Sequence, residues 1–493
     1  MVTIDRVLIA NRGEIARRIA TALLEKGIVP VLPITEKEYS QAVAGFKDCR
    51  LVNSPNTIYL DSDALVALAK SENCQAVHPG YGFLAENAGF AELCEGSGLI
   101  FIGPPASAMD LMGHKERARE IAKSANVPPV PGFSIDGQSD LEIKKMADRI
   151  GFPVLVKASM GGGGKGMRRV DNPEALFDAI RMSKSESAAY FGSEDVFVEK
   201  YIVKPRHIEI QIFSFTGGRT VYVGERECTI QRRHQKIIEE SPSPVVDEKR
   251  RREMGEAAVR IADSVNYIGA GTVEFIVDES LNFYFLEMNT RIQVEHPVTE
   301  EVFGVDLVAW QIEEAMGTVE AITQQELRGA GHAIEFRIYA EDPDQGFMPS
   351  PGKILLYQEP AGPGIRVESA VTTGSEIFAD FDPMIAKVVV RGHSRQHALD
   401  RAKWALSNFV IFGVTTNREF LMRIVEHPAF QSGELDTSFI DHYRADLTAK
   451  QDEISKEMLL LAAALRKTNG NGGKQAAPGD SQDFYPPVNI RLP

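Results

Sequence analysis

Residues 272–289 read TVEFIVDESLNFYFLEMN, two runs of alternating apolar and polar side chains separated by the polar segment Glu279–Asn282. This alternation predicts a hairpin of two antiparallel strands. If the hairpin is symmetric about its centre, Glu274 lies opposite Glu287, and the two-residue period of a strand puts Asn289 on the same face as Glu287. The hairpin therefore places two carboxylates and an amide side by side.

Opposed carboxylates of this kind have Cβ atoms about 5 Å apart and repel each other. A divalent cation turns that repulsion into binding, and carboxylate and amide oxygens are hard ligands that suit magnesium held together with nucleotide phosphates. The alternative is a solvated hairpin that carries stray acids, which the flanking Ile276 and Phe285 disfavour. We therefore predict a metal site at Glu274, Glu287 and Asn289.

A polar stretch follows the hairpin directly, with Arg291, Glu295 and His296 inside TRIQVEHP at residues 290–297. A guanidinium can clamp a small oxyanion with two hydrogen bonds, and a nearby carboxylate can take a proton from that oxyanion. This stretch therefore predicts an oxyanion site with a base next to the metal.

Basic residues concentrate upstream in ERECTIQRRHQK at residues 225–236, which contains Arg232–His234 and Lys236. In a chain of net charge -15 such a cluster is typical of an anion site, although a solvated charged strand fits this segment equally well. The basic run Lys249–Arg252 has a helical pattern, and there a solvated helix face is the better interpretation.

A glycine run, GGGGKG at residues 161–166, follows the apolar strand pattern Val154–Ala158. It leads into Met167–Val170 rather than into a helix, and no Ser or Thr follows Lys165, so neither a dinucleotide-binding turn nor a Walker A loop fits. The remaining interpretations are a glycine hairpin that folds over phosphates and a mobile surface loop. Lys157 on the preceding strand favours the phosphate interpretation.

Short apolar runs alternate with helical patterns over residues 6–103, which predicts a doubly wound parallel sheet. Its first turn, Asn11–Glu14, has a single glycine and so excludes a nicotinamide-binding fingerprint. Pro33 inside the second strand pattern predicts a sheet edge there. A long helix is expected over Ser107–Ala125, and the proline-rich segment Val127–Gly132 marks a boundary.

The composition is that of a multi-domain globular protein, because 43% of the 493 residues are hydrophobic and a chain of this length is expected to form about three domains. The 54 basic and 69 acidic residues disfavour binding to nucleic acid or to an anionic membrane surface. The four cysteines form no CxxC pair, so we expect reduced thiols and a cytoplasmic protein. Neither a signal-peptide core nor a membrane-spanning apolar segment is expected.

Eleven sequence blocks, in the order of a known family and spread over about residues 4–445, resemble the biotin carboxylase component of biotin-dependent carboxylases, which are ATP-grasp enzymes. The blocks include IANRGEIA, HPGYGFLAEN, FIGPP, LMGHK, GGGGKGM, EKYI, RHIEIQI, ERECTIQRRHQK, FYFLEMNTRIQVEHPVTE, EFRIYAEDP and MPSPGKI. The sequence departs from the family pattern at Met160, at Pro33–Asp48 and in the tail after about Arg444.

The resemblance implies an α/β and α+β multi-domain fold. Its parts would be a doubly wound pre-ATP-grasp domain at residues 1–113, an ATP-grasp domain at 114–330 whose glycine-rich lid covers about 131–203, and a C-terminal biotin carboxylase domain at 331–446. Outside the resemblance, apolar periodicity and a Gly- and Asn-rich composition predict a helix with a flexible tail at 447–493. In this family the C-terminal domain helps to build the biotin site and a homodimer.

The resemblance also assigns roles to motif positions. Lys236, Arg291 and the backbone of Val294 would bind bicarbonate. Glu295 would act as the general base, and Arg337 would steady the biotin enolate. The implied ligands of Mg²⁺ or Mn²⁺ are Glu274, Glu287 and Asn289, and the implied ATP contacts are Lys115, Lys157, Gly163, Gly164, Glu199, Lys200, Tyr201, Ile202, His207, Gln231 and His234.

The implied reaction has two steps: bicarbonate attacks the γ-phosphate of ATP to give carboxyphosphate, and biotin is then carboxylated. Because no Ala/Val-Met-Lys-Met sequence occurs, the biotin is expected on a separate carrier protein, with the carboxyltransferase as a further subunit. The acceptor stays open between acetyl-CoA, another acyl-CoA and pyruvate. Another ATP-grasp ligase or a non-catalytic homologue are the alternatives, and RIQVEHPVTE together with Arg337 favours biotin carboxylation over both.

Overall fold

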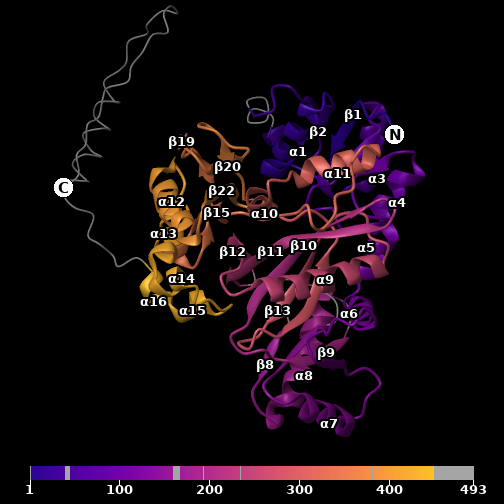
Figure 1. Ribbon diagram of the computed structural model, residues 1–493, viewed down its shortest axis with the longest axis vertical. Helices are drawn as coiled ribbons and strands as arrows, with labels where there is room; N and C mark the ends of the chain where they lie inside the picture. Colours follow the sequence, from indigo (N-terminus) through magenta and orange to yellow (C-terminus); the bar gives the residue numbers. More distant parts are fainter. Residues whose placement is uncertain are drawn as a thin grey trace, which may run out of the picture. The chain divides into compact units, whose positions relative to one another are not determined.

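The computed structural model describes residues 2–38, 45–158, 167–191, 194–233, 235–379 and 381–448, and these form one compact unit (Figure 1). Three sets of predictions lie outside the described residues. They concern the glycine run with Gly163 and Gly164, the basic residue His234, and the helix and linker of the tail.

The N-terminal part is a parallel five-stranded sheet in the order β3-β2-β1-β4-β5. Its main helix, α1, buries Ile15, Ile19 and Leu23, which recur every fourth residue and so form one apolar stripe. The predicted doubly wound sheet is therefore confirmed. Its elements are β1 (Arg6–Ile9), α1 (Gly13–Glu25), β2 (Val29–Thr35), β3 (Arg50–Ser54), α3 (Ser62–Ser71), β4 (Ala76–His78), α4 (Ala88–Gly96) and β5 (Ile100–Phe101).

The predicted sheet edge at Pro33 is wrong. β2 lies between β1 and β3, and Pro33 is the partner of Val52 on β3, a strand whose short and polar sequence gave no clear pattern. A proline removes one ladder hydrogen bond. Every residue of β2 after Val29 is buried, so apolar packing on both faces outweighs that loss.

The predicted long helix over Ser107–Ala125 is two helices, α5 (Ala106–Gly113) and α6 (Lys115–Ser124). His114 between them has an extended backbone, with φ -92° and ψ 108°. Gly113, a poor helix former, precedes this break. The break makes Lys115 the first residue of α6.

The centre of the molecule is an antiparallel eight-stranded sheet in the order β14-β13-β10-β11-β12-β15-β22-β20. It continues across the predicted domain boundary, because β12 pairs directly with β15. The helix α9 (Glu248–Ser264) packs against β10 and β11. The strands are β10 (Arg206–Phe215), β11 (Arg219–Arg232), β12 (Gln235–Ser241), β13 (Gly269–Val277), β14 (Phe283–Asn289), β15 (His332–Tyr339), β20 (Ile365–Ser369) and β22 (Met384–Gly392).

The basic run at the start of α9 is only partly solvated. Lys249 is exposed, but Arg251 pairs with the buried carboxylate of Glu225, with 2.6 Å between Nε and Oε2. The expectation of a fully solvated face is therefore wrong for Arg251, because a buried carboxylate on the neighbouring strand needs a cation.

A small sheet in the order β6-β9-β7-β8 lies within the predicted lid and has a hydrophobic core of its own. Ile143 and Ala147 of α7, Leu176 of α8, and Val154 and Val198 of the sheet are buried in that core. The elements are β6 (Gly132–Ser134), α7 (Asp140–Ile150), β7 (Val154–Ala158), β8 (Arg168–Val170), α8 (Leu176–Phe191) and β9 (Val196–Lys200).

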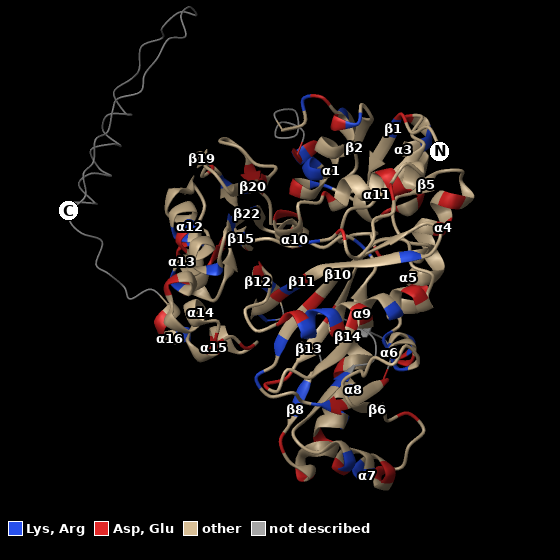
Figure 2. Cartoon of the chain, viewed as in Figure 1, with Lys and Arg blue, Asp and Glu red and all other residues tan. Residues whose placement is uncertain are grey.

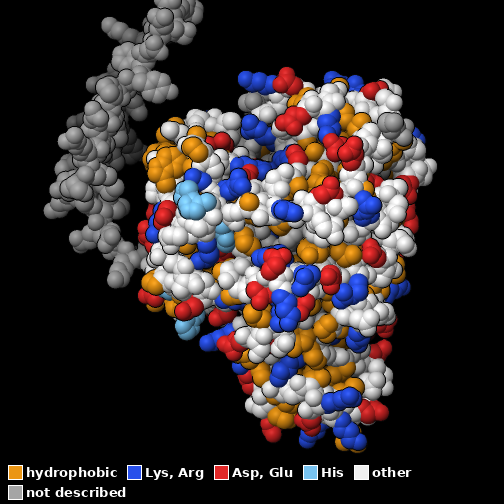
Figure 3. Space-filling view, in the orientation of Figure 1, with side chains coloured by type: hydrophobic (Ala, Val, Ile, Leu, Met, Phe, Trp, Pro, Cys, Tyr) orange, Lys and Arg blue, Asp and Glu red, His pale blue; other side chains and the backbone are white. Residues whose placement is uncertain are grey.

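The last part of the described chain packs helices and short strands against β15 and β22. Exposed apolar side chains gather on its outer side, and Figure 3 shows an orange patch over the region that Figure 1 labels β19 and α12. Helices α10 (His296–Phe303) and α11 (Leu307–Met316) precede β15, and α11 packs against α1 of the N-terminal part. The elements of the last part are β16 (Glu341–Asp342), β17 (Met348–Pro349), β18 (Gly352–Lys353), β19 (Leu356–Gln358), β21 (Glu376–Ile377), α12 (Arg395–Asn408), β23 (Val410–Phe412), α13 (Arg418–Glu426), α14 (Pro428–Ser432), α15 (Phe439–His442) and α16 (Arg444–Leu447).

The surface charges and the cysteines of the described chain are as the composition predicts. Figure 2 shows acidic and basic residues interleaved along the elements, without a continuous basic stripe on the face in view. All four cysteines are free thiols. Within the described ranges, every helix is too short or too polar to cross a lipid bilayer.

Candidate active site

The predicted pairing of the metal hairpin is confirmed: Glu274 on β13 faces Glu287 on β14, and Asn289 follows on the same face. The hairpin is not symmetric, however. A bulge lies between Glu274 and Phe275, and beyond it Phe275 faces Phe285, so the pairing shifts by one residue and the turn is centred on Ser280 rather than between Ser280 and Leu281. The bulge absorbs this shift and leaves the two carboxylates opposed.

Rows of directly paired residues carry the charged groups across the central sheet. One row runs from Glu287 through Glu274 and Glu209 to Arg226 on β14, β13, β10 and β11. Directly paired residues project from the same face, so the register itself gathers these groups. A second row on β15, β22 and β20 consists of Arg337, Lys387 and Glu368.

The donor set of the hairpin fits a divalent cation. Glu274 is buried, and Asn289 donates through Nδ2 to its Oε1 at 2.8 Å. The carboxylate of Glu287 is accessible at the opening of the site although protein surrounds it closely, and burial together with the Glu274 charge raises its pKa. A cation between the two glutamates would remove that repulsion.

Lys236 on β12 is the central cation of the site. Its Nζ lies 2.6 Å from Glu209, 2.8 Å from Glu274 and 2.6 Å from Glu295. Burial alone would lower the pKa of Lys236, but the three carboxylates outweigh it and raise the pKa well above its usual value. Lys236 therefore stays charged and neutralises the carboxylates around it.

Two groups of potential metal-ligand side chains surround this ammonium. They are His207 with Glu209 and Glu274, and Glu209 with Cys228 and Glu295, and within each group the ligand atoms lie within 4.8 Å of one another. Lys236 pairs with Glu209, Glu274 and Glu295, whereas Glu287 still repels the charge of Glu274, so the hairpin pair is the better metal site.

Glu295, the predicted base, is buried at the start of α10 between two cations. Arg337 donates through Nη2 to its Oε2 at 3.0 Å, and Lys236 lies on its Oε1. Burial favours the protonated carboxyl, but Lys236, Arg337 and the more distant Arg226 outweigh it and lower the pKa of Glu295. The structure thus brings Glu295, Lys236 and Arg337 into direct contact, although they lie far apart in sequence.

Arg291 is held by a residue that sequence reasoning missed. Its Nε lies 3.1 Å from Oε2 of Glu86, and its Nη2 donates to Oδ1 of Asn289 at 3.3 Å. Glu86 belongs to the block HPGYGFLAEN, which marked it as part of the family pattern but gave no role. Through this pair the N-terminal part of the chain orients the predicted oxyanion clamp.

The backbone of Val294 also has a partner that was missed. The ammonium of Lys387 on β22 donates to its carbonyl oxygen at 2.9 Å. Lys387 stands in the hydrophobic run MIAKVVVRG, where it interrupts an otherwise apolar buried strand. A lysine inside a buried apolar strand was the one sequence signal that could have marked Lys387 as a functional candidate.

The predicted nucleotide contacts form two groups. In the first, Lys157 pairs with Glu199 at 2.6 Å, and Arg119, which was not predicted, lies 3.2 Å from the same carboxylate. Burial and the nearby Lys157 lower the pKa of Lys115, while Glu287 and Glu199 oppose that shift. The positive charges of Lys115 and Lys157 thus act on each other, an arrangement that suits phosphate.

In the second group, His207 lies between two side chains, with Nε2 2.8 Å from Glu274 and Nδ1 2.6 Å from Nε2 of Gln231. Lys200 instead donates to the carbonyls of Gly151 and Phe152, at 3.0 Å each, and so holds the segment that leads into β7.

The two residues after Lys200 lie at the end of the lid sheet. The backbone N–H of Tyr201 donates to the carbonyl of Pro153 at 3.1 Å, and the guanidinium of Arg169 lies 4.6 Å from the centre of the Tyr201 ring. Ile202 is half-buried.

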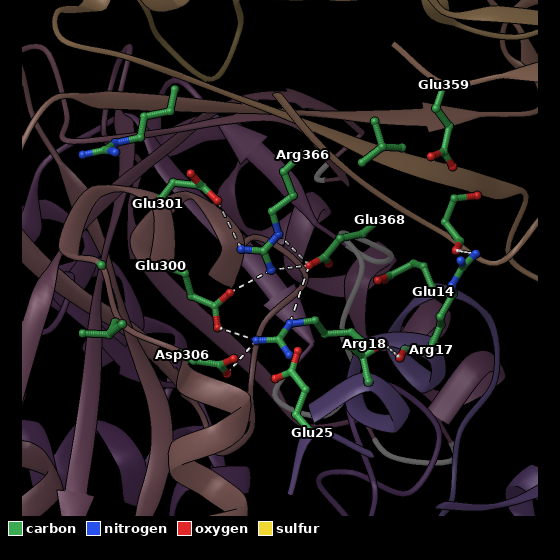
Figure 4. A pocket seen from close by; sticks show the side chains of 16 residues that line it. Glu14, Arg17, Arg18, Glu25, Glu300, Glu301, Asp306, Glu359, Arg366 and Glu368 are labelled. Carbon is green, nitrogen blue, oxygen red and sulfur yellow. Dashed lines mark hydrogen bonds and ion pairs between the residues drawn. The ribbon is translucent and has the colours of Figure 1, made fainter. Parts of the chain in front are cut away.

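A cavity of about 550 Å³ lies outside this constellation, lined by α1, α10 and β20 (Figure 4). Its charged groups bond mainly to one another: Arg18 lies 2.6 Å from Asp306 and 3.2 Å from Glu300, and Arg366 lies 2.8 Å from Glu300. Because these arginines already pair with carboxylates of the cavity, little of their charge is left to bind a ligand there.

An antiparallel hairpin with opposed carboxylates, a central buried lysine and a separate small lid sheet define the class of ATP-grasp enzymes. Three family models match the chain: "Biotin carboxylase, N-terminal domain" at residues 3–109, "Carbamoyl-phosphate synthase L chain, ATP binding domain" at 114–321, and "Biotin carboxylase C-terminal domain" at 335–442. The chain belongs to the biotin carboxylase family, as the resemblance implied, and it has the three-part architecture of that family.

Biotin carboxylase 1 of Bacillus subtilis is 47% identical over 444 residues, which are 89% of this chain and 99% of that protein. The mitochondrial methylcrotonoyl-CoA carboxylase subunit alpha of Dictyostelium discoideum is 46% identical over 464 residues, 93% of this chain, and the match spans only 66% of that longer protein.

A similar solved structure is the biotin carboxylase domain dimer of the Hydrogenobacter thermophilus 2-oxoglutarate carboxylase, in complex with MgADP, ADP and bicarbonate. It has a TM-score of 0.86 and 42% sequence identity, and the match covers 92% of this chain and all of that one.

Proposed function

We propose that this chain uses ATP and bicarbonate to carboxylate biotin that a separate carrier protein presents. One observation carries the proposal: the carboxylate of Glu295 is held between Lys236 and Arg337, at 2.6 and 3.0 Å, beside a hairpin with two opposed glutamates. The relative named biotin carboxylase and the related structure with MgADP and bicarbonate support the same assignment.

Glu274, Glu287 and Asn289 would hold Mg²⁺ or Mn²⁺, which supplies positive charge to the phosphates of bound ATP. Lys115 and Lys157 would bind the same phosphates, and the segment Glu199–Ile202 would hold the rest of the nucleotide. We assign the remaining ATP contacts to Gly163, Gly164, His207, Gln231 and His234.

In the first step, Lys236, Arg291 and the Val294 backbone would bind bicarbonate, and Glu295 would take its proton. The bicarbonate oxygen then attacks the γ-phosphate, which leaves ADP and forms carboxyphosphate. Because Lys236 and Arg337 hold the pKa of Glu295 low, the base gains strength only when these cations turn towards the substrate anions. Binding of bicarbonate and activation of the base are thereby coupled.

In the second step, carboxyphosphate breaks down to CO₂ and phosphate, the phosphate takes the ureido proton of biotin, and the biotin nitrogen attacks CO₂. Arg337 would stabilise the biotin enolate, because its guanidinium is already fixed at the site by Glu239 through a 2.6 Å hydrogen bond from Nε.

The partners proposed for the chain follow from this reaction. They are a biotin carrier protein, a carboxyltransferase subunit and a second copy of the chain, since the related biotin carboxylase domain is described as a dimer. We propose a cytoplasmic location, although some relatives are named as mitochondrial subunits. The acceptor of the carboxyl group is open, because the relatives are named for different acceptors, methylcrotonoyl-CoA and 2-oxoglutarate among them.

The test measures phosphate release and carboxybiotin with free biotin, MgATP and bicarbonate. We expect both products to require all three substrates, and Glu295→Gln to lose both by about 10²- to 10⁴-fold. Phosphate release that does not depend on bicarbonate, or phosphate transfer to another small acid, would instead indicate a different ATP-grasp ligase.

A further inference from the structure

Lys387 is a fully buried lysine whose ammonium makes one hydrogen bond and two ion pairs. Nζ donates to the carbonyl oxygen of Val294 at 2.9 Å and lies 2.7 Å from Oε2 of Glu368 and 3.3 Å from Oε2 of Glu14. The ion pairs balance the charge of the ammonium, and its hydrogen bond reaches the backbone of the active site.

Lys387 lies directly opposite Arg337 on the neighbouring strand, so both side chains project from one face of the sheet. Arg337 donates to the carboxylate of Glu295 at 3.0 Å, while Lys387 donates to the carbonyl of the preceding residue, Val294. Two adjacent cations thus hold the Val294–Glu295 segment: Arg337 binds the side chain of Glu295, and Lys387 binds the backbone of Val294.

The same segment is held at the residue before. Nδ1 of His296 lies 2.7 Å from the carbonyl oxygen of Gln293, and the side-chain amide of Gln293 donates to Glu274 at 3.0 Å. The carbonyl of Val294 between these contacts has Lys387 as its hydrogen-bond partner. Loss of that bond would remove the hydrogen bond from Lys387 that orients the carbonyl of the peptide leading into Glu295.

The charge of Lys387 is well supported. Burial opposes it, but Glu14 and Glu368 outweigh burial and raise the pKa of Lys387. A hydrogen bond from a charged donor is about twice as strong as a neutral one. Glu368 has a second cation, because it also bonds the guanidinium of Arg366, so the loss of Lys387 would not leave Glu368 unpaired.

We propose that Lys387 is a positioning residue for the bicarbonate half-reaction, which fixes the Val294–Glu295 peptide so that the oxyanion pocket and the base keep their relative geometry. This inference rests on the proposed function and adds to it a residue that touches neither the nucleotide nor the metal ligands. It also gives Glu14 and Glu368, which line the cavity of Figure 4, a connection to the active site.

The test replaces Lys387 with Met, which keeps the length and apolar stem of the side chain and removes its donors. We expect kcat/KM for bicarbonate to fall by about 10- to 100-fold, the usual effect of losing a charged hydrogen bond, while KM for ATP changes less than about twofold. The control is Glu14→Gln, which removes the charge of one ion-pair partner of Lys387 and leaves the hydrogen bond from Lys387 to Val294. It should keep bicarbonate kinetics within about threefold.

The results separate the outcomes. Unchanged bicarbonate kinetics in Lys387→Met overturn the inference, and so does an equal loss of affinity for ATP and bicarbonate together with a lowered Tm, which would indicate a purely structural role. If Lys387→Met is unstable, the double variant with Glu14→Gln removes the carboxylate left without a cation, and the same split between ATP and bicarbonate is required of it. A wild-type chain without bicarbonate-dependent ATP cleavage would refute the proposed function, whereas a normal wild type with a silent variant refutes only the role of Lys387.

Discussion

Glu239 and Glu295 share one guanidinium, since Arg337 donates through Nε to Glu239 at 2.6 Å and through Nη2 to Glu295 at 3.0 Å. The two carboxyls nevertheless differ in ionisation. Burial raises the pKa of Glu239 to about 7, whereas around Glu295 the cations outweigh burial and lower the pKa. One arginine therefore joins a carboxyl that titrates near neutral pH to one that stays ionised.

This difference predicts a pH-dependent stability for Glu239→Gln. A carboxyl whose folded-state pKa is raised from 4.5 to about 7 stabilises the fold at low pH, and that contribution is lost as the pH rises through about 7. Relative to wild type, the variant should therefore gain stability between pH 5 and pH 8, by about 3 kcal/mol at most. Urea unfolding at the two pH values measures this gain. Glu279→Gln, at the exposed turn of the metal hairpin, is the control and should show no such gain.

The metal hairpin gives a second prediction. Glu287→Gln removes one ligand charge and should lower magnesium-dependent phosphate release by about 100-fold. Its Tm should stay the same or rise, because the repulsion between Glu287 and Glu274 disappears. A magnesium titration of phosphate release, with a thermal melt of the same samples, measures both. Wild-type turnover at limiting magnesium would contradict the ligand assignment.

The third prediction separates the two half-reactions. Glu295→Gln should depress ATP cleavage and biotin carboxylation alike, by about 10²- to 10⁴-fold. Arg337→Ala should harm carboxylation more than ATP cleavage, because its guanidinium meets charge that appears only once biotin has lost its proton. Phosphate and carboxybiotin are measured on the same samples. Equal losses of both products in Arg337→Ala would assign this arginine to bicarbonate or ATP.

The fourth prediction concerns the sequence beyond the described residues. Deletion of residues 449–493 should spare activity on free biotin, because the candidate site lies wholly within the compact unit that ends at Thr448. Its composition, a helical pattern followed by a Gly- and Asn-rich spacer and Phe484–Pro487, is typical of a linker with an anchor, so assembly with the other subunits should weaken. Co-purification of the truncated chain with its partners tests this, and normal assembly would refute it.

The sequence predicted the metal hairpin well because its register follows from the alternation of side chains. Glu274 and Glu287 are opposed as expected. The bulge after Glu274 could not be foreseen, since it depends on how Phe275 and Phe285 pack in the core beneath the hairpin. The pairing of the carboxylates was thus predictable, whereas the position of the turn depended on tertiary packing.

Contacts between distant segments were beyond local reasoning. Glu86 and Arg291 meet because the segment after β14, through Ile292, packs in the same core as the N-terminal sheet, and nothing in either segment specifies the other. Lys387 gave only the weak signal of a charge inside an apolar strand. Pro33 was misplaced for the opposite reason, because a local rule about proline was overridden by burial of the whole strand. Residue types and motifs were therefore predictable, and the partners that tune them were not.

The direct pairing of β12 with β15 has a consequence for where this chain can be divided. The predicted boundary at residues 330 and 331 falls between two helices and a strand, but Ile238 and Phe336 are paired in the same sheet across it. A chain ending at Ala330 would expose the unpaired N–H and C=O groups of β12, an edge that recruits other strands. We expect such a fragment to aggregate rather than to fold and bind ATP. A gene fission that preserves folding therefore has to divide the chain outside the segment that forms this sheet.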